Sequence, residues 1–209
     1  MAYPEASKNT ELKNVRNLKI KPVSVVVIGS STGGVPVLTR ILSALKEFSP
    51  PIVIVQHMPR EYTGPFAERL NRLSIIFVAE ASNGDRLYRG HAFVAPGDSH
   101  VLLRRDGQGY FIEVNSDEPV NRFRPSVDVL FDSAARIPDR DIVGIILTGM
   151  GNDGAAGLLK MREKGQVTVA QDENSSAVFG MPREAIMRGA AAHVMSVDEI
   201  TAFINGLDE

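Results

Sequence analysis

The sequence predicts an α/β protein: a doubly wound, mostly parallel sheet with helices on both faces and an antiparallel β excursion near residues 86–115. Short runs of β-branched residues, such as residues 23–28 and 52–55, alternate with segments of helical periodicity. The runs are almost entirely apolar, as in strands buried on both faces of a parallel sheet. A length of 209 residues suits one such domain and is short for two.

The periodic segments follow one another in the order that a parallel sheet requires. After the first strand, Val37, Leu38, Ile41, Leu42 and Leu45 mark one apolar face of a helix. Further helices are expected at residues 66–73, 127–135, 155–163, 182–187 and 197–207. Further strands are expected at residues 52–55, 75–78, 142–147, 167–170 and 192–194.

The middle of the chain has a different pattern. Residues 86–88, 91–95, 101–104 and 110–114 look like short strands separated by glycine-rich turns, and Asp106-Gly107 suits a hairpin turn. We therefore expect the antiparallel excursion here.

Composition excludes several classes of protein. A net charge of −2 argues against a general nucleic-acid binder, and the absence of cysteine removes disulfides and thiolate chemistry. No apolar run reaches the roughly 18 residues of a membrane span, and the N-terminus lacks a signal-peptide core. We expect a cytoplasmic protein without membrane insertion, with residues 1–21 as a polar tail or linker and residues 22–209 as one domain.

Residues 29–33 match the Gly-x-Ser-x-Gly pattern, with Ser31 in the nucleophile position between a predicted strand and a predicted helix. The glycines permit a sharp turn, and the helix start offers unpaired N–H groups to a developing oxyanion. Two other interpretations of residues 29–33 stay open: a turn that only connects strand to helix, or a loop that binds a phosphate. The glycine spacing does not fit a dinucleotide site.

A serine nucleophile needs a base, and the chain has four histidines. His57 directly follows the strand at 52–55, which places it on the same sheet edge as Ser31. His100, in a loop, is the second choice. His91 and His193 are expected to be surface or structural residues.

The orienting carboxylate is expected to be Asp153, in a glycine-rich loop after the strand at 142–147. Asp98, Asp128 and Asp172 compete with it, and Asp153 could instead cap the helix that follows. A metal site is the remaining alternative, but no histidine pair has the helical spacing of a zinc enzyme. We expect no metal and no cofactor.

Six motifs in this order closely resemble the catalytic domain of the CheB family of chemotaxis methylesterases, over about residues 22–207. They lie at residues 28–34 (IGSSTGG), 55–59 (VQHMP), 95–97 (APG), 124–128 (RPSVD), 147–154 (LTGMGNDG) and 180–185 (GMPREA).

The resemblance implies hydrolysis of glutamate methyl esters on the cytoplasmic helices of chemoreceptors, with deamidation of receptor glutamines. It maps the nucleophile, base and carboxylate onto Ser31, His57 and Asp153, and an oxyanion-hole amide onto Met150. Thr32 is expected to line the same site.

Arg124 and Arg183 are candidates for contacting acidic receptor helices. Family members usually carry an N-terminal receiver domain. The roughly 21 residues before the first strand are compatible with an excised domain or with a stand-alone enzyme, so phosphorylation control is not inferred.

Two other function classes remain as alternatives: a serine esterase for a small diffusible ester, and a non-catalytic receptor-binding module. A deep apolar pocket beside Ser31 would favour the first, and loss of a triad residue would favour the second. A phosphate-binding sugar enzyme is a more distant third, because no basic clamp lies near Gly33 and Gly34.

Overall fold

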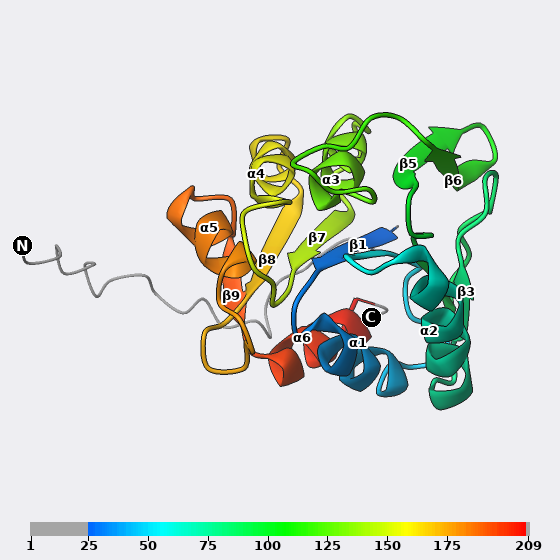
Figure 1. Cartoon of the computed structure of the whole chain (residues 1–209), viewed down its shortest axis with the longest axis horizontal. Helices are drawn as coiled ribbons and strands as arrows, with labels where there is room; N and C mark the ends of the chain where they lie inside the picture. The colour runs from blue at the N-terminus through cyan, green and yellow to red at the C-terminus, as the bar shows by residue number, and fades with distance from the viewer. Residues whose placement is uncertain (1–24, 208–209) are drawn as a thin grey trace, which may run out of the picture.

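The computed structural model describes residues 25–207, and its centre is a seven-stranded sheet (Figure 1). The strands of this sheet are β1 (Val25–Ser30), β2 (Ile52–Gln56), β3 (Phe77–Glu80), β4 (His91–Val94), β7 (Ile142–Ile146), β8 (Val167–Gln171) and β9 (His193–Met195). They are all parallel, in the order β3-β4-β2-β1-β7-β8-β9. The predicted fold class is confirmed. Residues 1–21, the expected tail or linker, lie outside the described residues.

The strand order reverses beside β1. The chain passes from β1 to β2 on one side and later returns to β7 on the other side. In open parallel sheets, the carboxyl ends of the strands at such a switch point form a crevice in which ligands bind.

Helices cover both faces of the sheet. They are α1 (Gly34–Ser43), α2 (Arg60–Leu73), α3 (Val127–Ala135), α4 (Ala155–Glu163), α5 (Met181–Met187) and α6 (Val197–Asn205). Figure 1 shows α1 and α6 below the sheet and α3 and α4 above it. Alternate residues of β1 serve the two cores: Val26 packs in the core with α1, α2 and α6, and Val27 packs in the core with α3, α4 and α5.

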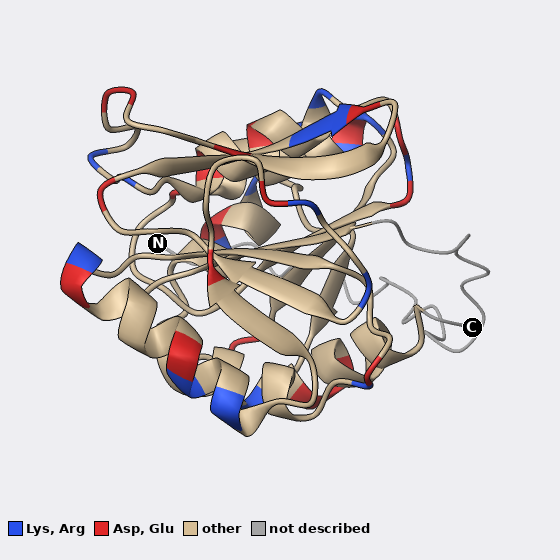
Figure 2. Cartoon of the chain, turned by 90° about the vertical axis from the view of Figure 1, so that its right-hand side faces the viewer, with Lys and Arg blue, Asp and Glu red and all other residues tan. Residues whose placement is uncertain are grey.

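The antiparallel excursion is a hairpin of β5 (His100–Asp106) and β6 (Gly109–Asn115). Its two-residue turn starts at Gly107, and the Asp106 carboxylate accepts a hydrogen bond from the Gln108 amide at 2.8 Å. The hairpin packs on α3, where Leu103 N donates to Ser133 Oγ at 2.8 Å. Charges of both signs lie on this side of the molecule (Figure 2).

Three details differ from the sequence-based expectation. Residues 91–94 form β4 inside the parallel sheet, where buried Ala92 and Phe93 pair with β2. Of the expected antiparallel strand at residues 86–88, the structure has one bridge, from Arg86 to Phe111. Strand β3 lies two residues later than predicted. Helix α2 begins at Arg60, six residues early, because hydrogen bonds of Thr63 tie its first turn to Gly97 and Glu80. Such tertiary contacts are invisible to local periodicity.

No helix within residues 25–207 combines the length and apolar character needed to cross a membrane.

Candidate active site

Three segments meet at the carboxyl ends of the central strands. Ser31 follows β1, His57 follows β2, and the loop containing Asp153 follows β7. The His57 amide donates to the Ser30 carbonyl at 3.1 Å, and the Ser31 amide donates to the Thr148 carbonyl at 3.0 Å. The sheet therefore holds the three segments side by side.

Ser31 sits on the sharp turn that the sequence predicts. The Gly34 amide donates to the Ser31 carbonyl at 2.8 Å, and α1 begins at Gly34. Gly33 has φ of 81°, and a Cβ there would lie 2.5 Å from the Cβ of Ala177, so the turn requires glycine. Ser31 is half-buried, whereas Ser30 is fully buried with its hydroxyl donating to Gln56 Oε1 at 2.7 Å. Ser31 is thus the serine open to a substrate.

His57 and Asp153 are in direct contact. His57 Nε2 lies 2.9 Å from Asp153 Oδ2, and the two side chains are only 7% and 1% exposed. His57 Nδ1 is buried without a hydrogen-bond partner, so the described residues include no hydrogen bond from Ser31 to this nitrogen. The structure brings the pair together and places Ser31 next to it. In active sites without substrate, the distance between a nucleophile and its base is often longer than a hydrogen bond and shortens when substrate binds.

The carboxylate of Asp153 accepts hydrogen bonds on both oxygens. Oδ2 accepts from His57 and from the Val127 amide at 2.7 Å, and Oδ1 accepts from Ser126 Oγ at 2.8 Å. Val127 is the first residue of α3, so Asp153 caps α3. The expectation that Asp153 could cap the following helix is wrong for α4, whose cap residue Gly154 has no side-chain hydrogen bond.

Burial acts to raise the pKa of Asp153, but the hydrogen bonds that the carboxylate accepts, first that of His57, outweigh it and lower the pKa. Asp128 lies beside it, and its carboxylate accepts from the Gly157 amide at 2.7 Å near the start of α4. Burial, and secondarily the charge of Asp153, raise the pKa of Asp128. Asp153 thus stays ionised while its neighbour gains a proton more easily.

The other candidate residues have structural surroundings. His100 Nδ1 accepts from the Ser126 amide at 3.2 Å, and its Nε2 lies 3.1 Å from the Glu118 carbonyl, so both ring nitrogens are occupied. Asp172 accepts from the Ser175 amide in its own turn. No group of three potential metal-binding side chains occurs among residues 25–207.

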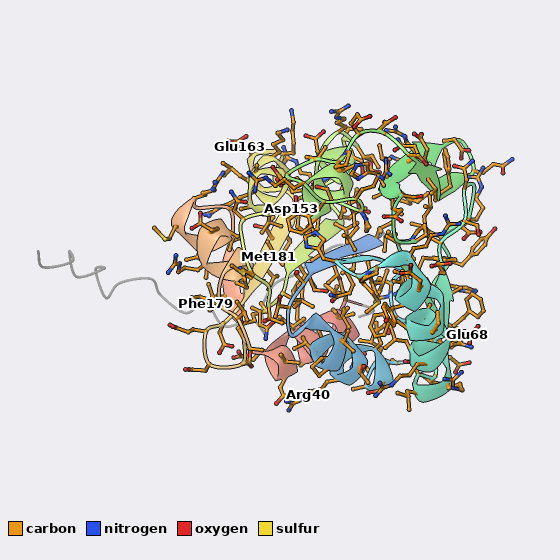
Figure 3. The ribbon with its side chains drawn as sticks, viewed as in Figure 1. Arg40, Glu68, Asp153, Glu163, Phe179 and Met181 are labelled. Atoms are coloured by element: carbon orange, nitrogen blue, oxygen red, sulfur yellow. The ribbon has the colours of Figure 1, made fainter. Side chains whose placement is uncertain are left out.

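Two backbone amides are available near Ser31. Within the described chain, the amides of Thr32 and Met150 make no hydrogen bond. A Cβ on Gly149 would lie 2.8 Å from the Cβ of Ser31, so the Met150 loop packs directly against Ser31. Figure 3 shows Asp153 and Met181 at this end of the sheet, and Met181 N donates to the Gly149 carbonyl at 2.8 Å. These contacts fix the loop beside Ser31 and leave two amides there free to donate to a ligand.

Gln56, which the sequence pattern does not single out, joins the segments that carry Ser31 and His57. Its buried Nε2 donates to the carbonyls of Ser31 and His57, each at 3.0 Å, while its Oε1 accepts from Ser30. One side chain thereby sets the spacing of the two backbones. Its place as the last residue of β2, directly before His57, was the available sequence signal.

We expect Gln56→Met to lower the free energy of unfolding by about 2–3 kcal/mol, because buried carbonyls lose their donor. Turnover per folded molecule should fall by about tenfold or more, because Ser31 and His57 lose their common anchor. The matched control is Gln166→Met. Buried Gln166 donates to the carbonyls of Ala134 and Asp139. These carbonyls lie near the carboxyl end of α3 and before the start of β7, at the opposite ends of these two elements from Ser31. The free energy of unfolding, measured in urea, should fall in both variants, and turnover should fall only in Gln56→Met. Equal losses of turnover in the two variants would refute the anchoring role.

Arg124 and Arg183 differ in their surroundings. The Arg124 guanidinium donates to the carbonyls of Ser116 and Asp117 at 3.1 and 3.2 Å, so it holds a loop of this chain. Arg183 is exposed, 4.0 Å from Glu184. Of these two arginines, Arg183 is the one whose side chain is largely exposed.

Comparisons with known proteins find one family and relatives of one kind. The family model described as CheB methylesterase matches residues 26–204. "Protein-glutamate methylesterase/protein-glutamine glutaminase 1" of Xanthomonas oryzae is 58% identical over 173 residues, which are 83% of this chain and 49% of the relative. The enzyme of the same description from Salmonella typhimurium is 51% identical over 177 residues, 85% of this chain and 51% of the relative. The chain spans about half the length of these curated relatives.

A solved structure is also similar. The crystal structure of the Thermotoga maritima CheB methylesterase catalytic domain superposes with a TM-score of 0.85 at 38% identity. The match covers 88% of this chain and 98% of that domain.

Proposed function

The chain belongs to the CheB methylesterase family, and on that premise we propose that it is a serine hydrolase that removes methyl groups from glutamate methyl esters on chemoreceptors. The substrate is proposed to be the cytoplasmic helices of these receptors, and the enzyme to act in the cytoplasm. Deamidation of receptor glutamines is proposed as a second reaction, because the same attack on an amide releases ammonia instead of methanol. A receiver domain as a further partner rests on the family resemblance alone.

The hydrogen bond of 2.9 Å between His57 and Asp153 is the observation that carries the proposal. An ionised carboxylate only accepts hydrogen bonds, so Nε2 of a neutral His57 carries the proton and Nδ1 is the free base. Nδ1 takes the proton of Ser31 as Oγ bonds to the ester carbonyl carbon. The resulting oxyanion accepts hydrogen bonds from the amides of Thr32 and Met150.

The second half of the reaction restores the enzyme. Protonated His57 gives its proton to the leaving methoxide, methanol departs, and the glutamyl group remains esterified to Ser31. Nδ1 then takes a proton from water, the resulting hydroxide equivalent attacks the acyl group, and Ser31 leaves with the proton returned by His57. The mechanism uses only side chains and amides of this chain.

The surroundings of Ser31 favour a macromolecular substrate over a small ester. Met150, next to the nucleophile, is 72% exposed. A cleft of about 550 Å³ is lined by charged side chains such as Arg104, Glu113 and Lys160 and not by Ser31 or His57. A small-ester enzyme would enclose its substrate in an apolar pocket at the nucleophile.

We expect methanol release from methyl-labelled receptor membranes to exceed that from N-acetylglutamate γ-methyl ester by about a hundredfold or more in kcat/KM. Contacts with the receptor surface supply binding energy that the small ester lacks. Ammonia release from receptors with unmodified glutamines, measured alongside, tests deamidation. Equal kcat/KM for both esters would contradict a macromolecular substrate.

A further inference from the structure

A tight turn at residues 120–123 lies between β6 and α3. Val120 N donates to the Phe123 carbonyl at 3.1 Å, and Phe123 N donates to the Val120 carbonyl at 2.9 Å. Its central residues, Asn121 and Arg122, have φ of 54° and 69°. Arginine rarely adopts this left-handed region, so contacts elsewhere must hold the turn in place.

Asn121 supplies one such contact. Its Nδ2 donates to Asp153 Oδ1 at 2.8 Å and to Asp128 Oδ2 at 2.7 Å. Both hydrogens of the amide are therefore used, each on a carboxylate. The bridge holds two like charges at a set distance and leaves Asp153 Oδ2 directed at His57.

Phe123 supplies the other contact. Its ring lies flat on the His57 imidazole, with ring centroids 3.9 Å apart and an interplanar angle of 6°. This stack covers one face of the imidazole, in keeping with the burial of His57. Asp153 holds the ring at Nε2, whereas Phe123 fixes the plane in which the ring lies. Together the two contacts leave Nδ1 as the free edge of the base.

We propose that the turn at residues 120–123 is a positioning clamp for the His57–Asp153 pair. Asn121 orients the carboxylate, and Phe123 fixes the plane of the imidazole and keeps water from its face. Neither residue exchanges a proton or forms a bond in the reaction, and each acts through His57 or Asp153, so both are positioning residues. The clamp rests on the proposed function only in that His57 acts as the base and Asp153 orients it.

The kinetic test compares variants with matched backbone changes. Asn121→Gly removes the bridging amide and keeps the positive φ, and Arg122→Gly makes the same backbone change without touching the pair. Phe123→Leu removes the stacked ring, Phe123→Tyr restores it, and Phe77→Leu removes a ring that lies 5.2 Å from His91 at the sheet edge. Steady-state methanol release from methylated receptor membranes gives kcat and KM for each variant.

We expect kcat to fall by about tenfold to a hundredfold in Asn121→Gly and Phe123→Leu, with KM within about threefold of wild type. Arg122→Gly, Phe77→Leu and Phe123→Tyr should stay within roughly threefold in kcat, because the pair keeps its geometry. An equal fall in Arg122→Gly and Asn121→Gly would overturn the clamp. So would a raised KM with unchanged kcat in Phe123→Leu, which would make Phe123 a substrate contact.

A second readout does not depend on the substrate. In protein with ¹⁵N-labelled histidine, the His57 Nε2 proton, assigned by its absence in His57→Gln, should exchange slowly with water in wild type. Exchange should be at least about tenfold faster in Phe123→Leu and unchanged in Phe77→Leu. Equal exchange in wild type and Phe123→Leu would overturn the shielding role. If the wild-type enzyme released no methanol, the proposed function would fail while this measurement still tested the clamp.

Discussion

Ser31→Ala is expected to reduce ester hydrolysis by a factor on the order of 10⁵ or more, because no other group can form the acyl-enzyme. The free energy of unfolding should hardly change, since the Ser31 hydroxyl makes no hydrogen bond within the described residues. Single-turnover methanol release and urea unfolding measure the two effects. The variant separates chemistry from folding because the side chain lies half-exposed on a turn that the backbone and the glycines maintain.

The neighbouring serine gives the opposite pattern. Ser30 is fully buried and donates to Gln56 Oε1. Ser30→Ala should lower the free energy of unfolding by about 1 kcal/mol. Its turnover should stay within about tenfold of wild type, because the nucleophile remains and Gln56 keeps both of its donated bonds. Loss of activity in Ser30→Ala with activity retained in Ser31→Ala would place the nucleophile at residue 30.

Ser31, His57 and Asp153 could be predicted as neighbours because each follows an apolar strand, and parallel strands end at one edge of the sheet. The β-branched runs of β1, β2 and β7 are long enough to identify without tertiary information. The segment at 91–94 shows the limit of this approach. Its buried run does not say which strand it pairs with, and only the assembled sheet places it between β2 and β3.

Asn121 and Phe123 could not be predicted as partners of the site from local pattern. They lie in a loop without periodicity, and their contacts with Asp153 and His57 join positions 32 and 66 residues apart in the chain. The capping of α3 by Asp153 is equally non-local, since the sequence suggested a cap for the helix that follows in the chain. The one available signal was position: the turn directly precedes the Arg-Pro-Ser-Val-Asp motif at residues 124–128.

The second large effect is expected from Asp153→Asn, which should reduce turnover by up to about ten-thousandfold, the scale of this change in a serine protease. Every partner of the Asp153 side chain is a hydrogen-bond donor: His57 and Val127 on one oxygen, and Asn121, Ser126 and Asp128 on the other. An asparagine has one oxygen, so its NH₂ group must face donors in either orientation. With the NH₂ group in place of Oδ2, both His57 and the Val127 amide lose their acceptor. With the NH₂ group in place of Oδ1, Asn121 and Ser126 lose theirs.

These contacts change the stability expected for the variant. Asparagine could replace a simple helix cap with little loss of stability, but the buried mismatch of donors should lower the free energy of unfolding by about 3 kcal/mol. The lowered pKa of Asp153 means that ionisation stabilises the fold above the carboxyl's ordinary pKa. That stabilisation is lost as the pH falls through the lowered value. Urea unfolding at a series of acid pH values should therefore show a shallower decline in Asp153→Asn than in wild type.

A helix cap alone would give a different result, and Ser196→Ala is the matched control. Ser196 caps α6 through the Glu199 amide, on the face of the sheet opposite α3. Its removal should cost about 1 kcal/mol of stability and leave turnover unchanged. If Asp153→Asn behaved like Ser196→Ala, with lower stability and normal turnover, Asp153 would be a cap and not the orienting carboxylate. Within residues 25–207, the carboxylate hydrogen-bonded to His57 is that of Asp153. That outcome would therefore mean that His57 acts without a carboxylate partner.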